Sequence, residues 1–432
     1  MKRIRPNIAV LGLGHTGCIY ASSLANLGYK VTAFDLDQKL LDDLQKGISP
    51  ISEPEFSLII KKNLGKNIIF NKNIDQVLKD RDYIFISQDL VVDEKNNIDL
   101  TNFNKLINIL MKHLPESTTL VISSQIPVGT SKKIAQGLQD KHIKLIYFAE
   151  NLRLGDGFNT FLNPDRIVLG SDSKQTIQQF IQDFAFFKCP ILKMSLESAE
   201  MSKHALNSFL ALNISFASEM ADLCEAFGAN YLDVVSALKT DHRVSKFAPI
   251  NPGLGFGGGS LGRDVLTLIN LSKKSKYQPK ILKSILDVNQ QRINHIVSRI
   301  ERIIPKLKQK RIGILGLTFK PTSNIINRSM SVMLAKALHK KSALIRAFDP
   351  KVKKRIATDR YINICQDEAD FFKNLDLTIL MTPHGEFRKI NPKLIAKLMR
   401  TKIIFDSCSF LNRQSYVSLG FKFYATGLGE RA

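Results

Sequence analysis

Three glycines near the start of the chain have a spacing that suits phosphate binding. An apolar stretch at residues 7–14 runs into Gly12, Gly14 and Gly17, and a helical pattern follows through Leu27. In such a strand–turn–helix unit the first glycine permits a tight turn, the second lets a pyrophosphate approach the backbone, and the third allows close helix–strand packing. The helix N-terminus adds unpaired N–H groups and the positive end of a dipole. The spacing therefore predicts a dinucleotide-binding turn.

An acidic residue stands where such a turn needs one. Asp35 closes the next apolar stretch, Lys30–Asp35, 18 residues after Gly17. A carboxylate in that place accepts hydrogen bonds from a ribose 2′-hydroxyl and repels a 2′-phosphate. The alternative is an aspartate that ends a strand and only caps a loop. The combination with the glycines favours NAD over NADP as the cofactor.

The elements that must position these residues alternate between strands and helices. Apolar strands are predicted at Tyr83–Ser87, Thr119–Ser123 and Leu145–Phe148, with helical stretches between them. This alternation predicts a parallel sheet covered by helices. From about Glu197 to Phe227 apolar residues recur at helical spacing, which predicts one long helix of roughly 45 Å. Helical sequence also covers Asp264–Arg302.

A second α/β pattern begins at Arg311. Arg311–Gly316 and Ala343–Asp349 are predicted strands that end in a glycine and an acid, as the first two strands do. Ser329–His339 is predicted helical, and strands are predicted at Leu377–Thr382 and Lys402–Asp406. The fold class is therefore α/β, with two Rossmann-like doubly wound domains joined by a central helical segment that contains one long helix. The predicted domains are 1–196, which binds the cofactor, 197–302, which is helical, and 303–432.

Six short motifs occur in one order along nearly the whole chain. They are Gly47–Pro54, Pro127–Thr130, Pro164–Gly170, Ala199–Asn207, Gly253–Asp264 and Gly316–Pro321. With these motifs the sequence resembles the UDP-glucose/GDP-mannose dehydrogenase family. The resemblance implies oxidation of the C6 alcohol of a nucleotide-linked sugar to a carboxylate with two NAD. It also implies that the C-terminal domain binds the nucleotide sugar and that the protein acts in polysaccharide biosynthesis.

The resemblance implies catalytic roles for four polar residues. A base must take the alcohol proton as hydride leaves, and Glu150 stands at the family's acid/base position. Lys203 is expected to stabilise the developing oxyanion, and Asn207, four residues later, to share that work. Asp264 is expected to hold or activate water. Each has an ordinary alternative: a solvated lysine, a packing amide, a helix cap or a surface acid.

Other residues are expected to bind ligands by the same resemblance. Arg243 would reach the phosphate of the sugar nucleotide, within its own chain or across a dimer interface, and Lys320 would face the nucleotide diphosphate. Gln125 is expected beside the cofactor, where the family has threonine. The predicted substrate-binding residues are Arg153, Arg243, Phe256, Gly257 and Lys320.

The nucleophilic cysteine of that family is missing. Alignment of Gly253–Asp264 with the family loop places Ser260 at its position. The family's thiol captures the aldehyde, and a second hydride then leaves a thioester. A serine hydroxyl is a far weaker nucleophile at neutral pH and needs an adjacent base, yet the loop contains no histidine. Leu90-Val91 also replace a family Thr-Pro, so the cofactor glycines are retained while other positions have changed.

Two functions of different classes are compatible with these residues. The first is an NAD-dependent oxidoreductase that oxidises a sugar alcohol of a UDP- or GDP-sugar. It would stop after one hydride or reach the acid through a hydrated aldehyde, without a thioester. The alternative is a catalytically silent relative that binds NAD or a nucleotide sugar and has a regulatory or scaffolding role. A weaker third option is an epimerase-like removal and return of hydride.

Composition narrows the class of protein further. The five cysteines have no metal-ligand spacing, so no metal site is predicted and most are expected to be buried small apolar residues. No apolar stretch is long enough to span a bilayer, and a cytoplasmic location is expected. The net charge is +23, and a Lys-rich solvated surface is favoured over steering of a polyanionic small substrate or weak nucleic-acid contact. No nucleic-acid-binding motif accompanies the charge. The long helix has apolar residues around much of its surface, which indicates either a homodimer interface, as the resemblance also implies, or packing within the chain.

Overall fold

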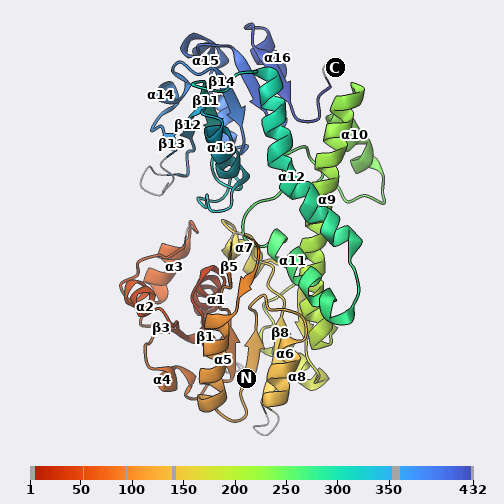
Figure 1. The fold of residues 1–432 in the computed structure, drawn as a ribbon. Helices are drawn as coiled ribbons and strands as arrows, with labels where there is room; N and C mark the ends of the chain where they lie inside the picture. The colour runs from red at the N-terminus through yellow and green to blue at the C-terminus, as the bar shows by residue number, and fades with distance from the viewer. Residues whose placement is uncertain (1–4, 52, 94, 139–142, 353–360, 430–432) are drawn as a thin grey trace. The chain divides into compact units, whose positions relative to one another are not determined.

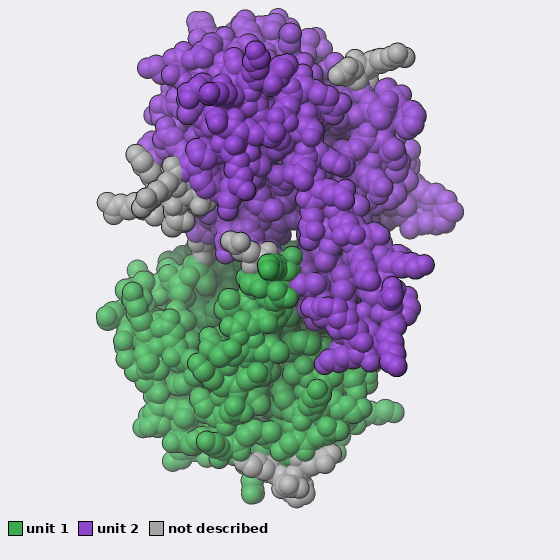
Figure 2. All heavy atoms as spheres, viewed as in Figure 1, with its two compact units in different colours: residues 1–206 green, residues 207–432 purple. Residues whose placement is uncertain are grey.

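The protein is described by a computed structural model that covers residues 5–51, 53–93, 95–138, 143–352 and 361–429. Ser52, within the predicted Gly47–Pro54 loop, lies outside these residues. The chain divides into two compact units, Met1–Leu206 and Asn207–Ala432, which are coloured separately in Figure 2. Each unit contains one large sheet, and the residues of each are described separately below.

The first unit is built on an eight-stranded sheet with the order β10-β9-β8-β7-β4-β1-β2-β3. The central strand β1 is Asn7–Leu11, and its two neighbours continue the chain in opposite directions across the sheet. This reversal is the topological switch point at which doubly wound folds bind ligands. The other strands are β2 (Lys30–Phe34), β3 (Ile68–Phe70), β4 (Tyr83–Ile86), β7 (Thr119–Ile122), β8 (Lys144–Phe148), β9 (Ile167–Gly170) and β10 (Ile191–Met194).

Strong burial explains why the central strands form where the sequence predicts them. All four residues of β4 and of β7 are buried, as expected for parallel strands covered on both faces. Strand β9 differs from the predicted parallel arrangement, because it pairs antiparallel with β8. A two-stranded antiparallel ribbon, β5 (Val91–Val92) and β6 (Ile98–Asp99), follows β4.

The helices of this unit connect successive strands and pack on the sheet (Figure 1). Asp37 begins α2 by accepting hydrogen bonds from Lys39 N and Leu40 N, as an N-cap residue does. The helices are α1 (His15–Asn26), α2 (Gln38–Gln45), α3 (Phe56–Asn63), α4 (Ile74–Leu78), α5 (Thr101–His113), α6 (Thr130–Gly137), α7 (Gly157–Leu162) and α8 (Lys174–Asp183).

The predicted long helix is α9, Leu196–Phe227, with 32 residues. At 1.5 Å per residue it is roughly 48 Å long. The boundary between the two units falls inside it, between Leu206 and Asn207. Helix α10 (Tyr231–Thr240) follows α9, outside the helical sequence that was predicted. The helical sequence predicted over Asp264–Arg302 forms α11 (Leu261–Ser272) and α12 (Lys280–Ile303), with a short 3₁₀ turn, η2 (Lys273–Ser275), after α11.

The second unit ends in a six-stranded parallel sheet with the order β13-β12-β11-β14-β15-β16. Strand β11, Arg311–Leu315, lies between β12 and β14, so this sheet has the same reversal as the first. The other strands are β12 (Leu344–Phe348), β13 (Ile362–Ile364), β14 (Leu377–Leu380), β15 (Ile403–Asp406) and β16 (Lys422–Ala425). The remaining helical elements are α13 (Met330–Lys340), α14 (Glu368–Phe372), η3 (Gly385–Lys389), α15 (Pro392–Leu398) and α16 (Arg413–Val417).

The two sheets repeat one set of backbone contacts. Gly12 N donates to Phe34 O at 2.9 Å in the first, and Gly316 N donates to Phe348 O at 2.8 Å in the second. Both glycines have positive φ, +87° and +92°. An acid at the start of the next central strand also recurs, because Asp82 accepts Asn7 N at 2.7 Å and Asp376 accepts Arg311 N at 2.8 Å. The α/β class with two Rossmann-like sheets joined by a helical segment is thus confirmed.

Candidate active site

The glycine turn has the geometry that its spacing predicts. Gly12 has a left-handed φ of +87°, which a side chain disfavours. A Cβ at Gly17 would collide with the carbonyl oxygen of Gly12, so only glycine lets α1 pack this closely against the turn. Leu13 and Cys18 beside the turn are buried, and Cys18 Sγ donates to Leu13 O at 3.1 Å. The turn is therefore held tightly at the carboxyl end of β1.

Asp35 braces this turn from the end of β2. One carboxylate oxygen accepts Leu13 N at 2.5 Å, and the other accepts Asp37 N at 2.8 Å. The side chain therefore does cap a loop, as the alternative interpretation held. Each carboxylate oxygen has a further lone pair, so this role leaves acceptor capacity for a ribose hydroxyl.

A carboxylate also lies at the N-terminus of α1. Asp89, in the loop after β4, accepts a hydrogen bond from His15 N at 2.7 Å. A Cβ added at Gly14 would overlap this carboxylate, so the glycine leaves room for an anionic group beside the helix terminus. The space that Gly14 opens is therefore suited to negative charge.

A buried cation faces an acid at the same edge of the sheet. Lys203 on α9 is 8% exposed, and its Nζ lies 3.3 Å from Glu150 Oε2 in the loop after β8. Gln125 lies in the loop after β7, which is the neighbour of β8 in the sheet. The structure therefore brings the predicted residues Lys203 and Glu150 into direct contact.

One positioning residue in this unit was not singled out from the sequence. Glu200 is completely buried, and its two carboxylate oxygens accept Gly129 N at 2.5 Å and Ser131 N at 2.8 Å. It thus ties the start of α9, one turn before Lys203, to the N-terminus of α6. Burial raises the pKa of Glu200, although these hydrogen bonds act in the opposite direction. Its place in the Ala199–Asn207 motif was the only signal available.

In the second unit two more predicted residues form a contact. Asn207 Nδ2 donates to Asp264 Oδ2 at 2.5 Å, and Arg263 Nε lies 3.0 Å from the other oxygen of that carboxylate. Asp264 is fully buried, and the other two residues are less than 10% exposed. Ser260, by contrast, is exposed at the start of α11, and its hydroxyl makes no capping hydrogen bond with the helix.

The glycine loop before α11 is held from two sides. Phe256 N donates to Asn289 Oδ1 at 2.8 Å, and Asn289 Nδ2 donates back to Phe256 O at 3.0 Å. Gly258 N donates to Arg328 O at 3.1 Å, and a Cβ at Gly257 would lie only 2.6 Å from that same oxygen. Asn289 was not predicted; only its polar character within the apolar periodicity of α12 could have indicated it.

Lys320 lies near this loop through an aromatic ring. The ring of Phe319 is packed against Gly258, and Lys320 Nζ lies 5.7 Å from the ring centroid. The Phe319 ring thus lies between Lys320 and the glycine loop that contains Phe256 and Gly257. Arg243 instead forms a two-pronged pair with Asp241, at 2.6 and 2.9 Å, in an exposed loop after α10. In the first unit, Arg153 pairs with Asp165 at 2.7 Å and is also exposed.

Comparison with known families agrees with this geometry. The family described as "UDP-glucose/GDP-mannose dehydrogenase family" matches in three parts: its NAD binding domain over residues 6–187, its central domain over 197–291 and its UDP binding domain over 313–413. The UDP-glucose 6-dehydrogenase of Rickettsia conorii is 30% identical over 430 residues, covering 98% of this chain and 99% of that protein. This chain belongs to the UDP-glucose/GDP-mannose dehydrogenase family.

Other relatives extend the same match. UDP-glucose 6-dehydrogenase TuaD of Bacillus subtilis is 27% identical and covers 97% of this chain and 93% of its own. Among solved structures, a UDP-glucose dehydrogenase from Pyrobaculum islandicum has a TM-score of 0.89 at 24% identity, and each chain is covered to 99%. A UDP-D-ManNAc dehydrogenase from Pyrococcus horikoshii has a TM-score of 0.86 at 23% identity, with 98% and 100% covered. These structures share the fold of this chain.

NAD is the cofactor of this dehydrogenase family, and the first unit fits it. Gly12, Gly14 and Gly17 form the turn, the N-terminus of α1 offers N–H groups, and Asp35 directly follows β2, where an acid that would bind the ribose is expected. Within the described residues, no group of three or more His, Cys, Asp or Glu side chains could hold a metal ion. Among those residues no helix combines the length and apolar character that a membrane span needs.

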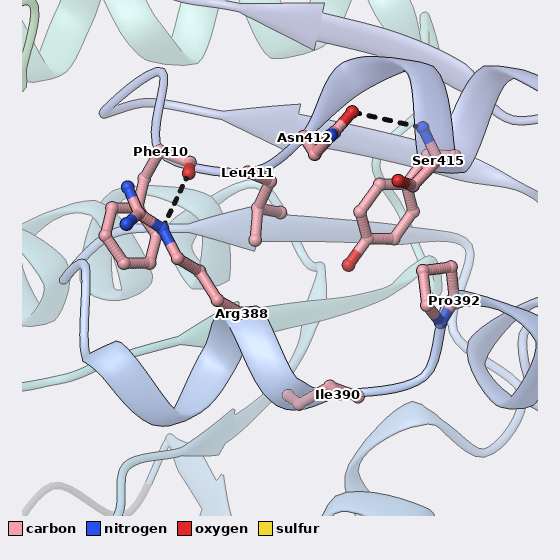
Figure 3. A pocket seen from close by; sticks show the side chains of 8 residues that line it. Arg388, Ile390, Pro392, Phe410, Leu411, Asn412 and Ser415 are labelled. Carbon is pink, nitrogen blue, oxygen red and sulfur yellow. Dashed lines mark hydrogen bonds between the residues drawn. The ribbon is translucent and has the colours of Figure 1, made fainter.

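One pocket of the second unit is lined by none of the predicted site residues. It has a volume of about 410 Å³ (Figure 3), and part of its lining comes from the segment that follows β15 in the chain. The Arg388 guanidinium lies 3.9 Å from the centroid of the Phe410 ring, and Arg388 Nε donates to Phe410 O at 3.3 Å. Because this pocket is not at the β11–β14 switch point, it is not the expected position of a nucleotide in this fold. Its lining residues are Arg388, Ile390, Pro392, Phe410, Leu411, Asn412, Ser415 and Tyr416.

Proposed function

We propose that the protein oxidises a sugar alcohol of a UDP-sugar with NAD and does so without a thioester intermediate. Membership of the nucleotide-sugar dehydrogenase family supports the reaction class, and its relatives named above act on UDP-sugars by their names. The observation that carries the proposal is the buried contact of Lys203 with Glu150, because it retains the groups for alcohol oxidation in a chain that has Ser260 in place of the thiol.

The residues of the first unit would perform the proton transfer. When bound, NAD accepts the hydride that leaves the alcohol carbon with its bonding electron pair. Glu150 would take the proton from the alcohol oxygen as the carbonyl forms. Lys203, 3.3 Å from Glu150, would stabilise the negative charge that develops on that oxygen. Gln125 would lie beside the cofactor, and Arg153 would help to bind the substrate.

The residues of the second unit would hold the substrate and water. Asn207 and Asp264, joined at 2.5 Å, would orient a water molecule or the carbonyl oxygen. Phe256 and Gly257 would line the sugar, and Lys320 and Arg243 would neutralise the phosphates. Ser260 would not form an acyl intermediate, because its exposed hydroxyl has no base in its loop to activate it. These roles would be divided among three domains, for which the predicted boundaries are 1–196, 197–302 and 303–432.

The test counts NADH formed per sugar consumed. Purified protein is mixed with NAD and a panel of UDP- and GDP-sugars, and the product is identified. One NADH per sugar with a carbonyl product supports a single two-electron step, and two with a carboxylate product support a hydrated aldehyde as intermediate. A covalent adduct between enzyme and sugar that forms during turnover and is cleaved by added thiol would indicate a thioester and contradict the proposal. Turnover of GDP-sugars alone would also contradict it.

A silent binding protein is the second candidate. It is favoured by Ser260 and by the Asp89 carboxylate at the N-terminus of α1, both of which weaken the case for efficient turnover. This candidate predicts that a nucleotide sugar binds without any NADH appearing. Formation of NADH from any sugar of the panel would exclude it.

We also propose that the protein is a homodimer that assembles through α9. Five large apolar side chains of the second unit recur on this helix with intervals of three, four, seven and four residues, and all are at least 36% exposed. This spacing places them along one stripe, as in helix–helix interfaces. They are Phe209, Leu212, Phe216, Leu223 and Phe227. A soluble, cytoplasmic role in polysaccharide biosynthesis is consistent with this assembly.

A further inference from the structure

The loop after β4 places a negative charge at the cofactor's phosphate site. Asp89 Oδ2 lies 2.7 Å from His15 N, and the Thr16 side chain also hydrogen-bonds to this carboxylate. The carboxylate fills the space above Gly14 that a Cβ would otherwise take. The chain's own acid therefore interacts with the first backbone N–H of α1, that of His15, and with the side chain of Thr16.

A dinucleotide pyrophosphate needs those same groups. The unpaired N–H groups and the positive dipole end of α1 are the features that bind phosphate in this type of fold. A carboxylate there stabilises the helix terminus in the absence of ligand, because negative charge at an N-terminus is favourable. When a pyrophosphate approaches, the same carboxylate is a like charge and competes for the N–H donors.

We propose that Asp89 is an internal competitor of the cofactor, whose carboxylate must move away or be protonated before the pyrophosphate binds. The proposal rests on the NAD site in the first unit and not on turnover of any sugar. Asp89 as a residue retains solvent-exposed surface in a loop, so its side chain can leave the helix terminus without disturbing the sheet. Asp89 thus sets how tightly this chain binds NAD.

The competition makes cofactor binding depend on pH. Loss of solvent around the Asp89 carboxylate raises its pKa, and the charge of Glu150 acts in the same direction, whereas His15 lowers the pKa. Cys18 on α1 also faces this carboxylate, and His15 Nε2 lies 2.7 Å from Glu53 Oε1. Because protonation removes the competing charge, binding of a pyrophosphate tightens as pH falls. At a pH where Asp89 is ionised, a pyrophosphate can bind while the Asp89 side chain stays in place only if the carboxylate takes up a proton.

The experiment measures binding of two probes by titration calorimetry. ADP-ribose carries the pyrophosphate, and adenosine lacks it. In Asp89→Asn the amide still accepts the His15 N–H but has no charge, and in Asp89→Gly the side chain is removed. We expect both variants to bind ADP-ribose about tenfold more tightly than the wild type, with adenosine affinity unchanged. Asp80→Asn is the matched control, because it removes one exposed charge from the same unit at a left-handed position that asparagine also adopts.

The pH series separates Asp89 from its neighbours. Titrations in buffers of different ionisation enthalpy report proton uptake, which we expect for the wild type and not for Asp89→Asn. Any proton uptake by His15 also occurs in Asp89→Asn, so the difference in proton uptake between the wild type and this variant is due to Asp89. Unchanged ADP-ribose affinity in both variants, equal tightening for adenosine, or no ADP-ribose binding by folded variants would overturn the proposal. Thermal denaturation of each variant establishes that it is folded.

Discussion

At the scale of single residues, the first unit combines a retained cation with a retained acid. Lys203 is 8% exposed and lies 3.3 Å from Glu150, a position that an ordinary solvated lysine does not adopt. Lys203 is buried and Glu150 is partly buried, and in the proposed mechanism this setting would strengthen the effect of the lysine on a nearby oxyanion. The sequence offered only the resemblance for these roles, because the two residues are far apart in the chain.

Replacement of Lys203 by methionine should remove the oxyanion stabilisation and leave the cofactor site intact. We expect kcat for sugar oxidation to fall by about 10²–10³-fold. The dissociation constant for NAD should remain that of the wild type, because Lys203 is not part of the glycine turn. Lys132→Met serves as control, since Lys132 is an exposed lysine that pairs with Glu197 at 2.6 Å. Loss of NAD binding in Lys203→Met, or full activity, would contradict the assignment.

Ser260 allows a test in which a nucleophilic thiol is introduced at its position. In Ser260→Cys a thiol stands at the start of α11, where it can capture the aldehyde and permit a second hydride to leave. If the wild type forms one NADH per sugar, we expect the variant to form two and to become sensitive to iodoacetamide. The control is Ser275→Cys, an exposed serine of the same unit. A ratio that stays at one in Ser260→Cys would show that the rest of the thioester machinery is absent.

At the scale of elements, an acid at the end of β12 braces the loop after β11. Asp349 Oδ2 accepts Leu317 N at 2.6 Å and Thr318 N at 2.9 Å, and His384 Nε2 lies 3.1 Å from the same oxygen. Burial alone would raise the pKa of Asp349, but the hydrogen bonds from His384 and Thr318 outweigh it and lower the pKa. The carboxylate is therefore held in its ionised form.

This brace should make the second unit sensitive to acid. A lowered pKa in the folded state contributes stability that is complete above the unfolded value, about 3.9, and is lost as pH falls through the folded value. We expect Asp349→Asn to be less stable than the wild type at pH 7, by about 1–3 kcal/mol. Thermal melting from pH 7 to pH 3 should show this difference shrinking. Asp233→Asn, at an exposed acid, is the control. A difference that stays constant with pH would be evidence against the brace.

The sequence predicted elements where the pattern was long enough. The central strands were recognised because short runs of buried, mostly apolar residues form them, such as the four successive residues Ile8–Leu11 in β1 and Tyr83–Ile86 in β4. The edge strands β3 and β13 have three residues each, too few to produce a period, and were not predicted. Contacts such as Asn207 with Asp264 join residues 57 positions apart, and the loop that carries Asp89 has no periodicity. Such features depend on tertiary structure and could not be derived from local sequence.

At the scale of the whole molecule, the predicted dimer depends on the apolar stripe of α9. Phe216, in the middle of the stripe, is 44% exposed, a feature that a solvated helix surface does not favour. We expect Phe216→Glu to weaken dimerisation by about 2 kcal/mol or more, roughly thirtyfold in the dissociation constant. Light scattering over a concentration series measures the mass of each species. Leu58→Glu, at an exposed leucine of α3, is the control. A wild type that remains monomeric at all concentrations would contradict the proposal.

The repeated brace has a consequence for how this lineage can change. In each sheet the loop after the first strand is fixed by a glycine, a backbone carbonyl and one acid, Asp35 or Asp349. Because a glycine, the backbone and one acid supply this brace, we expect substitutions at other side chains of the site to alter binding before they alter foldability. An ancestor with such an arrangement could exchange a thiol for a hydroxyl, or gain an acid beside its cofactor, and still produce a foldable descendant. Because both loops are held in this way, new activities can evolve on this fold before stability becomes limiting.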